Sequence, residues 1–360
     1  MLTTAPAVFA VGNEYQIMVR TEKECLFSVR IGERTYYDES NGIMNSLSPI
    51  HRVKVPMKAL DEAKSYTVCV RPLIKRKPYF PLTEEPIEET FVFHPLPETD
   101  IRAYHLADAH NKIEEPVRAA NVFGEIDLLI LNGDIINHSG DPSKFDNIYE
   151  ISARLTAGTR PVIFSRGNHD MRGNFAEKFA DFTPNQNGNT YYSFRLGSLW
   201  GVLLDCGEDK DDLHPEYGYT VACHAFRERQ TDFLRTLIEN ADREYAAEGV
   251  KTKLVIAHSP FTQKIWAPFD IEEPIYREWC ALLREQVKPD LMICGHMHKE
   301  ELRPIGHEAD TYGQPCPVVI GARPAENYFL GCGFVFGKDK IEVTFTDSDG
   351  NVFPQDEILF

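Results

Sequence analysis

The stretch Pro161-Val162-Ile163-Phe164-Ser165-Arg166-Gly167-Asn168-His169-Asp170 decides how the rest of the chain is interpreted. Its apolar run Val162–Phe164 predicts a short buried strand, bounded by a proline and a glycine. An amide, an imidazole and a carboxylate follow with no apolar residue between them. A loop that only turned the chain would not need this set, and ligands bind at the carboxyl ends of strands in open α/β sheets. The stretch therefore indicates a functional site at a strand end.

Four other predicted strand ends carry residues of the same kinds. From Ile101 onward, apolar strands alternate with helical stretches, which predicts an α/β domain with a central sheet. Imidazole, carboxylate and carboxamide groups are ligands of first-row divalent metals, and Asp-x-His and His-x-His each place two of them on one side of an extended segment. One such histidine alone is more often structural, but the whole set in this order predicts a metal site. Its members follow separate strands: Asp108 and His110; Asp134; Asn168 and His169; His258; His296 and His298.

The first hundred residues have a different pattern. Short strands separated by turns run from Glu14 to Phe93 without a convincing helix longer than two turns, which predicts a small β-sandwich of the immunoglobulin or fibronectin kind. No catalytic cluster is evident there, and His51 is expected to be a core or surface histidine. Six prolines between Arg71 and Pro97 predict a stiff connection. The expected domains are residues 1–97, the sandwich, and residues 98–360, the catalytic domain.

Four helices are predicted in the second domain. Two are expected at residues 112–123 and from Asp141-Pro142 onward, where an N-cap aspartate precedes a first-turn proline. The other two are expected at residues 226–245 and 274–287.

Composition and charge limit the classes of function. The net charge of −17 disfavours non-specific binding to nucleic acid or to anionic membranes. No run of 18 apolar residues is present, so no membrane span is expected. Met1–Gly12 has no basic residue before its apolar part, so we expect it to belong to the fold and not to a signal peptide. Eight cysteines without a C-x-x-C motif favour free thiols in a reducing cytoplasm.

The ordered motifs resemble those of the calcineurin-like metallophosphoesterase superfamily. The family pattern is D-x-H, G-D, G-N-H-[DE], H and G-H-x-H, and every part is present between Asp108 and His298. The resemblance covers roughly residues 98–346 and implies a four-layer α/β/β/α sandwich with two facing mixed sheets. It also implies two metal sites that share Asp134. One would be held by Asp108, His110 and His298, and the other by Asn168, His258 and His296.

The resemblance also implies roles for two neighbouring residues. His169 would lie outside the metal ligands and act on the phosphate or the leaving group. Asp170 would orient His169.

A fibronectin-like domain ahead of such a catalytic domain is also seen in purple acid phosphatases. Those enzymes use D-x-G and G-D-x-x-Y, whereas this chain has His110 in the first motif and Asn137 in place of the tyrosine. No tyrosinate ligand is therefore expected for a ferric ion at that position. The similarity is architectural and does not assign a substrate.

The residues suggest a concrete chemistry. Two divalent ions (Mn, Fe or Zn) would offset the negative charge of a phosphate ester, and a hydroxide bridging them would attack phosphorus. His169 would stabilise developing charge or protonate the leaving oxygen. The predicted function is a dinuclear metal-dependent hydrolase of phosphate esters, either a phosphatase or a phosphodiesterase. The alternative is a non-catalytic metal-binding scaffold or partner-binding protein with the same fold.

Substrate contacts and partners are less specified. Arg172, Asn137 and His138 are candidate contacts because they closely follow metal-site motifs. The acidic loop 208–212 is interpreted either as a rim or lid that disfavours highly charged substrates, or as a solvated surface loop. The expected partner is a small phosphorylated compound or a phosphodiester, and the oligomeric state is left open.

Overall fold

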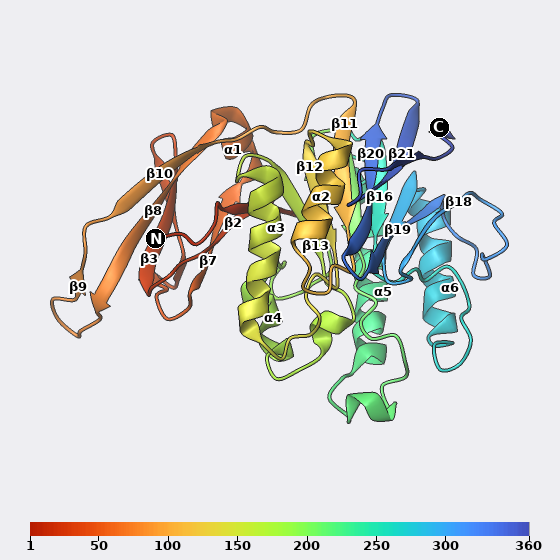
Figure 1. Ribbon diagram of the computed structural model, residues 1–360, viewed down its shortest axis with the longest axis horizontal. Helices are drawn as coiled ribbons and strands as arrows, with labels where there is room; N and C mark the ends of the chain where they lie inside the picture. The colour runs from red at the N-terminus through yellow and green to blue at the C-terminus, as the bar shows by residue number, and fades with distance from the viewer. Residues whose placement is uncertain (360) are drawn as a thin grey trace.

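A parallel sheet covered by two helices forms the first half of the C-terminal region in the computed structural model, which describes residues 1–359 (Figure 1). Its strands are β11 (Ile101–Leu106), β12 (Leu128–Asn132) and β13 (Pro161–Ser165), and each pairs in parallel with the next. The connecting helices are α2 (Glu114–Phe123) and α3 (Asp146–Thr156). Parallel strands need a crossover connection. Right-handed crossovers that add strands in one direction leave both helices on the same face of the sheet.

A second parallel sheet repeats this arrangement. Strands β15 (Leu199–Leu203), β16 (Thr252–Ile256) and β17 (Leu291–Cys294) pair in order. Helices α5 (Cys223–Glu239) and α6 (Glu273–Leu282) lie between them in the chain and cover the outer face of this sheet (Figure 1).

One strand joins the two sheets. The first part of β19 (Val318–Ala325) pairs with β17, and its last part pairs with β20 (Tyr328–Phe336), which is a neighbour of β11. The remaining strands of the C-terminal region extend these sheets: β14 (Tyr192–Leu196), β18 (Lys299–Arg303), β21 (Lys340–Asp347), β22 (Val352–Pro354) and β23 (Ile358–Leu359).

Three apolar cores separate four layers. Ile130 and Ile163 of the first sheet face Ile256 of the second across the central core. Alternate residues of the same strands point the other way, so that Leu129 packs under α2 and α3 and Val255 packs under α5 and α6. Burial of each such aliphatic side chain contributes about 1.5–3 kcal/mol to the free energy of unfolding. The α/β/β/α sandwich implied by the family resemblance is thereby confirmed.

The N-terminal region is β-rich, as predicted. Strands β3, β4, β8, β9 and β10 form one sheet, and β1, β2 and β7 lie in the other, with a small β5–β6 hairpin beside them. The two sheets share the apolar core that contains Phe27, Val53 and Val68. The single helix of this region, α1, has seven residues, in agreement with the expectation of no long helix. The elements are β1 (Ala7–Val11), β2 (Glu14–Arg20), β3 (Cys25–Ile31), β4 (Arg34–Tyr37), β5 (Glu39–Ser40), β6 (Ile43–Met44), β7 (Ile50–Pro56), α1 (Met57–Ala63), β8 (Ser65–Lys75), β9 (Leu82–Thr83) and β10 (Ile87–Val92).

Strand β1 connects the N-terminal region to the first parallel sheet of the C-terminal region. Val8 pairs with Pro161 and Phe9 with Val162, in parallel, so the sheet runs without a break from β13 through β1 and β2 to β7. The first residues of the chain thus belong to the fold, as expected. The division at residue 97 stays a prediction, and the two regions on either side of it share both a sheet and a core.

The helix prediction for residues 226–245 is wrong at its C-terminal end. Helix α5 ends at Glu239, because the Asn240 amide Nδ2 and its backbone N–H both donate to the Thr236 carbonyl oxygen and close the last turn. At the predicted N-cap, Asp141 Oδ1 accepts from the Ser143 N–H at 3.0 Å, as expected. This cap begins a short 3₁₀ turn, Pro142–Phe145, that leads into α3.

No helix within residues 1–359 is both long enough and apolar enough to cross a membrane. All eight cysteines are free thiols, and seven of them are buried.

Candidate metal centre

The predicted ligands meet at one end of the two sheets. Asp108 and His110 follow β11, Asp134 follows β12, and Asn168 follows β13. His258 follows β16 in the second sheet, while His296 and His298 follow β17. The structure brings all seven side chains together, because the carboxyl ends of parallel strands lie at a common edge.

Several of these loops have unusual backbone conformations. Asp108, Asp134 and His296 have φ angles of 54°, 53° and 67°, in the left-handed region that costs free energy for residues other than glycine. His110 and His298 share this conformation, with φ angles of 45° and 49°. Strain of this kind clusters at functional sites, where the surrounding structure holds it in place.

Gly133 allows two of these loops to approach each other. A Cβ atom at this position would lie 2.6 Å from Gly167 Cα and 2.7 Å from His258 Nδ1. No side chain fits there, so the glycine before Asp134 is required for the loops after β12 and β13 to touch.

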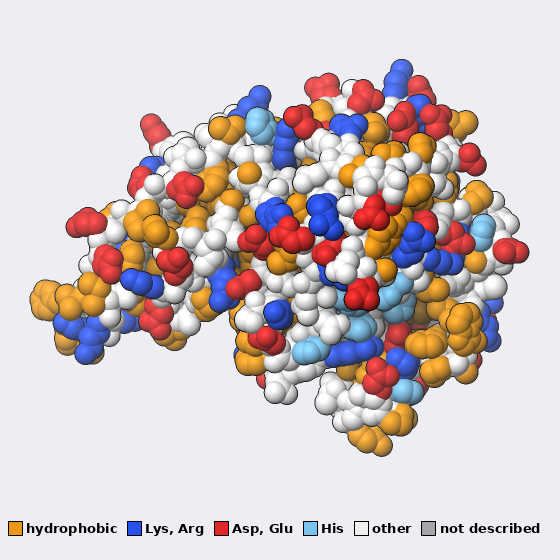
Figure 2. All heavy atoms as spheres, in the orientation of Figure 1, with side chains coloured by type: hydrophobic (Ala, Val, Ile, Leu, Met, Phe, Trp, Pro, Cys, Tyr) orange, Lys and Arg blue, Asp and Glu red, His pale blue; other side chains and the backbone are white. Residues whose placement is uncertain are grey.

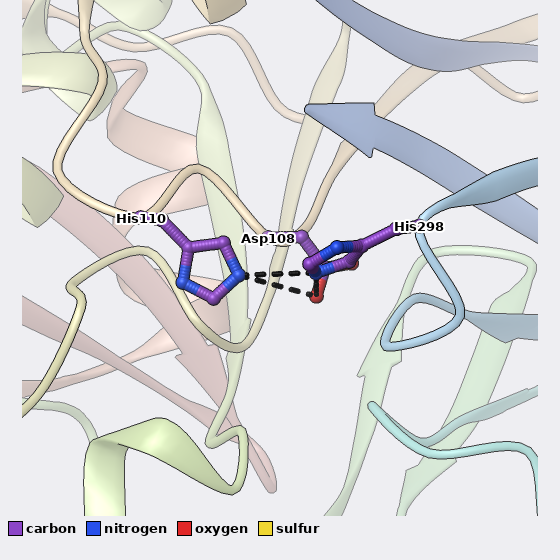
Figure 3. A group of neighbouring side chains, drawn as sticks. All are labelled: Asp108, His110 and His298. Carbon is purple, nitrogen blue, oxygen red and sulfur yellow. Dashed lines mark hydrogen bonds and ion pairs between the residues drawn. The ribbon is translucent and has the colours of Figure 1, made fainter. Parts of the chain in front are cut away.

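The first candidate metal group consists of Asp108, His110 and His298. Figure 3 shows both imidazole rings directed toward the Asp108 carboxylate. The two Nε2 atoms lie 3.1 Å apart, and His298 Nε2 lies 3.3 Å from Asp108 Oδ1. Three potential ligand atoms therefore converge on one point.

The second candidate group consists of Asp134, His258 and His296. His258 Nε2 lies 3.2 Å from Asp134 Oδ2 and 3.7 Å from Asp108 Oδ1, so it faces the carboxylates of both groups. The side-chain amide of Asn168 lies 3.1 Å from His296 Nδ1, which brings the amide into the same group. A third set, His110, Asp134 and His169, overlaps both.

Unsatisfied polar atoms show that the residues fit a divalent metal. Asp108 Oδ1 and His258 Nε2 are buried and have no hydrogen-bond partner within residues 1–359. An unpaired buried polar atom costs about 1–3 kcal/mol, and cation binding would remove that cost. The carboxylate, imidazole and amide donors match the preferences of first-row divalent ions.

The tautomer of His258 is consistent with this role. Its Nδ1 lies 2.6 Å from the Asn132 carbonyl oxygen and donates to it, so Nε2 is the ring nitrogen that faces the carboxylates. Burial would lower the pKa of His258, but attraction to Asp134 and Asp108 raises it to about 10. Strong attraction for a positive charge at this position is what a cation site requires. By contrast, burial lowers the pKa of His296 to about 4 and keeps that ring neutral.

His169 and Asp170 lie beside the candidate ligands. The His169 backbone N–H donates to Asp134 Oδ1 at 2.9 Å, and its ring Nδ1 lies 3.0 Å from the Asn137 carbonyl oxygen. Asp170 Oδ2 accepts from the N–H groups of Gly167 and Asp134, at 2.8 and 3.2 Å. Burial, followed by repulsion from Asp134, raises the pKa of Asp170 to about 8. Asp170 therefore fixes the two loops, while its contact with the His169 ring, expected from the resemblance, is not among the hydrogen bonds of the structure.

The three candidate substrate contacts lie in different environments. Arg172 lines a cavity of about 370 Å³ next to the ligands. Asn137 and His138 are exposed and do not line this cavity, although the backbone carbonyl of Asn137 holds His169. Their roles as substrate contacts stay predictions.

Other residues of the cavity gave weaker signals in the sequence. The acidic loop contributes Asp209 and Lys210 to the lining, so its interpretation as a rim is the one that the structure supports. Ile265, Trp266, Phe269 and Met297 also line the cavity and were not predicted. Two aromatic residues, Trp266 and Phe269, follow soon after the candidate ligand His258, and this pattern could have indicated part of the lining.

Comparison with known proteins identifies the family. The family model described as calcineurin-like phosphoesterase matches residues 101–300, which is more than half of the chain and includes all seven candidate ligands. The chain belongs to the calcineurin-like phosphoesterase family. No curated protein matches it by sequence.

Similarity to solved structures supports the fold. Purple acid phosphatase PPD1 from yellow lupin (Lupinus luteus) seeds aligns with a TM-score of 0.64 at 14% identity, over 100% of this chain and 75% of the lupin chain. Vacuolar protein sorting 29 from Cryptosporidium parvum aligns with a TM-score of 0.37 at 12% identity, over 73% of this chain and 100% of that one. The lupin structure extends the fold similarity to the N-terminal region.

Proposed function

We propose that this chain hydrolyses phosphate esters with two divalent metal ions bound at the strand ends. The observation that carries the proposal is that two candidate ligand groups adjoin, since His258 Nε2 of one lies 3.7 Å from Asp108 Oδ1 of the other and neither of these buried atoms has a hydrogen-bond partner within residues 1–359. Family membership agrees with this assignment.

Each ion has a candidate set of ligands. Asp108, His110 and His298 would hold one ion, Asn168, His258 and His296 would hold the other, and Asp134 would contact both. When bound, the ions supply activation of the attacking water and neutralisation of the phosphate charge. Mn²⁺, Fe²⁺ and Zn²⁺ all suit this mixture of nitrogen and oxygen donors.

The remaining steps belong to the chain's own residues. His169 Nδ1 is held by the Asn137 carbonyl oxygen and its Nε2 lies 3.5 Å from Arg172 Nη1, so Nε2 is the ring nitrogen that remains for the substrate. When the ring carries its second proton, Nε2 can donate a hydrogen bond to a phosphate oxygen or a proton to the leaving oxygen. Asp170 keeps the His169 loop against the Asp134 loop through two backbone hydrogen bonds.

The experiment compares hydrolysis of p-nitrophenyl phosphate and bis-p-nitrophenyl phosphate by the full chain loaded with Mn²⁺. Asp134→Asn serves as the control. Turnover of either compound that is lost in the control supports the proposal, and the ratio of the two rates separates a phosphatase from a phosphodiesterase. No turnover of either compound would contradict the proposal and favour a non-catalytic binding protein.

Metal identity leads to a spectroscopic prediction. Asn137 stands where purple acid phosphatases have a tyrosine ligand, so iron loading should give a protein without a tyrosinate-to-iron visible band. An absorption spectrum of the iron-loaded chain measures this. A purple protein would contradict the assignment of the second motif.

A further inference from the structure

The cavity beside the candidate metal centre is lined by two chemically different sets of side chains. His169, His296 and His298 belong to the polar set together with Asp134 and Asn168. Ile265, Trp266, Phe269 and Met297 form the other set, which we call the apolar wall. Figure 2 shows histidine side chains gathered on one face of the molecule, close to a group of hydrophobic side chains. A substrate with its phosphorus at the metal centre would therefore meet an apolar surface with the rest of its body.

Trp266 is the most unusual member of the apolar wall. It is 74% exposed, whereas the other two tryptophans of the chain, Trp200 and Trp279, are buried. The Phe269 N–H donates to the Trp266 carbonyl oxygen at 2.9 Å, so a turn holds the two aromatic residues together at the cavity. A large aromatic side chain that packs against little of its own protein is available to a ligand.

The cationic side chains of the cavity are already paired. Arg172 donates to both carboxylate oxygens of Glu208 at 2.8 Å, and its guanidinium lies 3.4 Å from Glu216. Lys210 lies 2.9 Å from Asp209 and 3.1 Å from Glu216. Bidentate pairing of this kind fixes an arginine in place. No unpaired lysine or arginine lines the cavity within residues 1–359.

The charge balance of this rim opposes additional anions. Three carboxylates, those of Glu208, Asp209 and Glu216, surround two cations, so the rim has an excess of negative charge. The two metal ions would attract one phosphate group, but a second anionic group further along the cavity would find no free cation. The free-energy cost of removing water from this second anionic group would not be offset by an ion pair, so binding would be weaker.

From these walls and this charge balance we infer the substrate class. We propose that the cavity selects phosphate esters whose organic group is aromatic or similarly flat and apolar, bound against Trp266 and Phe269, and which carry no further anion. This inference rests on the proposed function for the position of the phosphate. It assigns to the Trp266 wall a specificity role that the metal ligands do not have.

The test measures binding without turnover. The probes are phenylphosphonate, 4-carboxyphenylphosphonate and methylphosphonate, which have no ester bond to hydrolyse, present the same phosphonate group and differ only in the other substituent. Calorimetry on the Mn²⁺-loaded full chain gives each dissociation constant. Quenching of tryptophan fluorescence reports contact with Trp266, because the other two tryptophans are buried.

The phenyl probe should bind about tenfold more tightly than the methyl probe, the size of an aromatic contact with its buried area. The added carboxylate should weaken binding of the phenyl probe. Trp266→Ala should abolish the preference for phenyl over methyl. Tyr219→Ala is the matched control, because Tyr219 is 83% exposed and does not line the cavity, and it should keep the preference.

Three outcomes would overturn the inference: equal affinity for the phenyl and methyl probes, a preference that survives in Trp266→Ala, or binding of neither probe. Preferential binding of the phenyl probe by a protein that hydrolyses no ester would support the apolar wall and contradict only the proposed hydrolysis. The two claims are thus distinguishable.

Discussion

Two buried histidines in this protein each face an aspartate, and they differ in one respect. In the N-terminal region, His51 Nδ1 lies 2.7 Å from Asp38 Oδ2 and its Nε2 lies 3.2 Å from Cys25 Sγ, so both ring nitrogens have partners. In the C-terminal region, His258 Nδ1 donates to the Asn132 carbonyl oxygen, and its Nε2 lies 3.2 Å from Asp134 Oδ2 without forming a geometrically acceptable hydrogen bond to any group within residues 1–359. Both rings are almost fully inaccessible to solvent.

The difference separates a structural histidine from a candidate ligand. Burial and a nearby carboxylate are common to both sites and therefore do not discriminate. The discriminating feature is the unsatisfied nitrogen, which lies among other unsatisfied atoms such as Asp108 Oδ1. A satisfied cluster stabilises the fold, whereas an unsatisfied one requires a ligand to compensate for its burial.

Replacing the aspartate in each cluster should give the largest contrast. Asp134→Asn should lose most activity and more than about 100-fold in metal affinity, since loss of an outer partner alone costs 10–100-fold. Asp38→Asn, the matched control, should retain metal and activity. Metal content and turnover of the two purified variants measure the contrast, and the same loss in both, or in neither, would remove the distinction between the clusters.

His169→Ala should have the next largest effect. It should slow hydrolysis about 10²–10⁴-fold, the range for a positioned acid–base group, while both metals remain bound. Steady-state kinetics together with metal analysis of the variant separate chemistry from metal binding. Loss of metal would instead make His169 a ligand, which its proximity to His110 and Asp134 permits.

Asp170→Asn should have a smaller effect, because Asp170 contacts the loop backbones and not the cavity. We expect activity and metal affinity to fall by about 10–100-fold, as for other outer partners of metal sites. Titration of the variant with Mn²⁺ measures this. An effect as large as that of Asp134→Asn would place Asp170 among the ligands.

Cys25, Asp38 and His51 form the His51 cluster. Substitutions in this cluster should change the free energy of unfolding and not the activity, and the change should depend on pH. Burial would lower the pKa of His51, but its hydrogen bonds with Asp38 and Cys25 raise it to about 9. Because this value lies above the ordinary 6.5, the stabilisation is complete below about pH 6.5 and is lost as the pH rises through about 9. The shift corresponds to about 3 kcal/mol.

Denaturant unfolding of the native protein and of His51→Gln between pH 6 and 10 measures that contribution. The difference in unfolding free energy between the two proteins should shrink across this interval. A constant difference would mean that the Asp38–His51 pair is not charged in the folded state. Asp38→Asn provides the same comparison should His51→Gln fold poorly.

The sequence was sufficient to predict the layers of the C-terminal region and the convergence of the candidate ligands. Each motif follows a short apolar strand, and strand polarity alone brings Asp108, Asp134 and His258 to one edge. Periodicity and turn residues also indicated a β-rich N-terminal region. These features depend on local signals, namely apolar runs bounded by glycine or proline.

The features that the sequence did not reveal depend on distant pairings. Strand β1 joins β13 across more than 150 residues, and nothing in Ala7–Val11 marks its partner. The pairing of Arg172 with Glu208 is equally non-local, although it decides whether that arginine is free for substrate. The C-terminal end of α5 was missed because the capping role of Asn240 depends on geometry and not on residue type alone.

The central claim is that two metal ions bind on either side of Asp134. Anomalous diffraction from crystals of the full chain loaded with Mn²⁺ tests it most directly. Two anomalous peaks are expected, and both should contact Asp134. One should lie beside Asp108, His110 and His298, and the other beside Asn168, His258 and His296. A single peak, peaks elsewhere, or no peak at this edge of the sheets would contradict it.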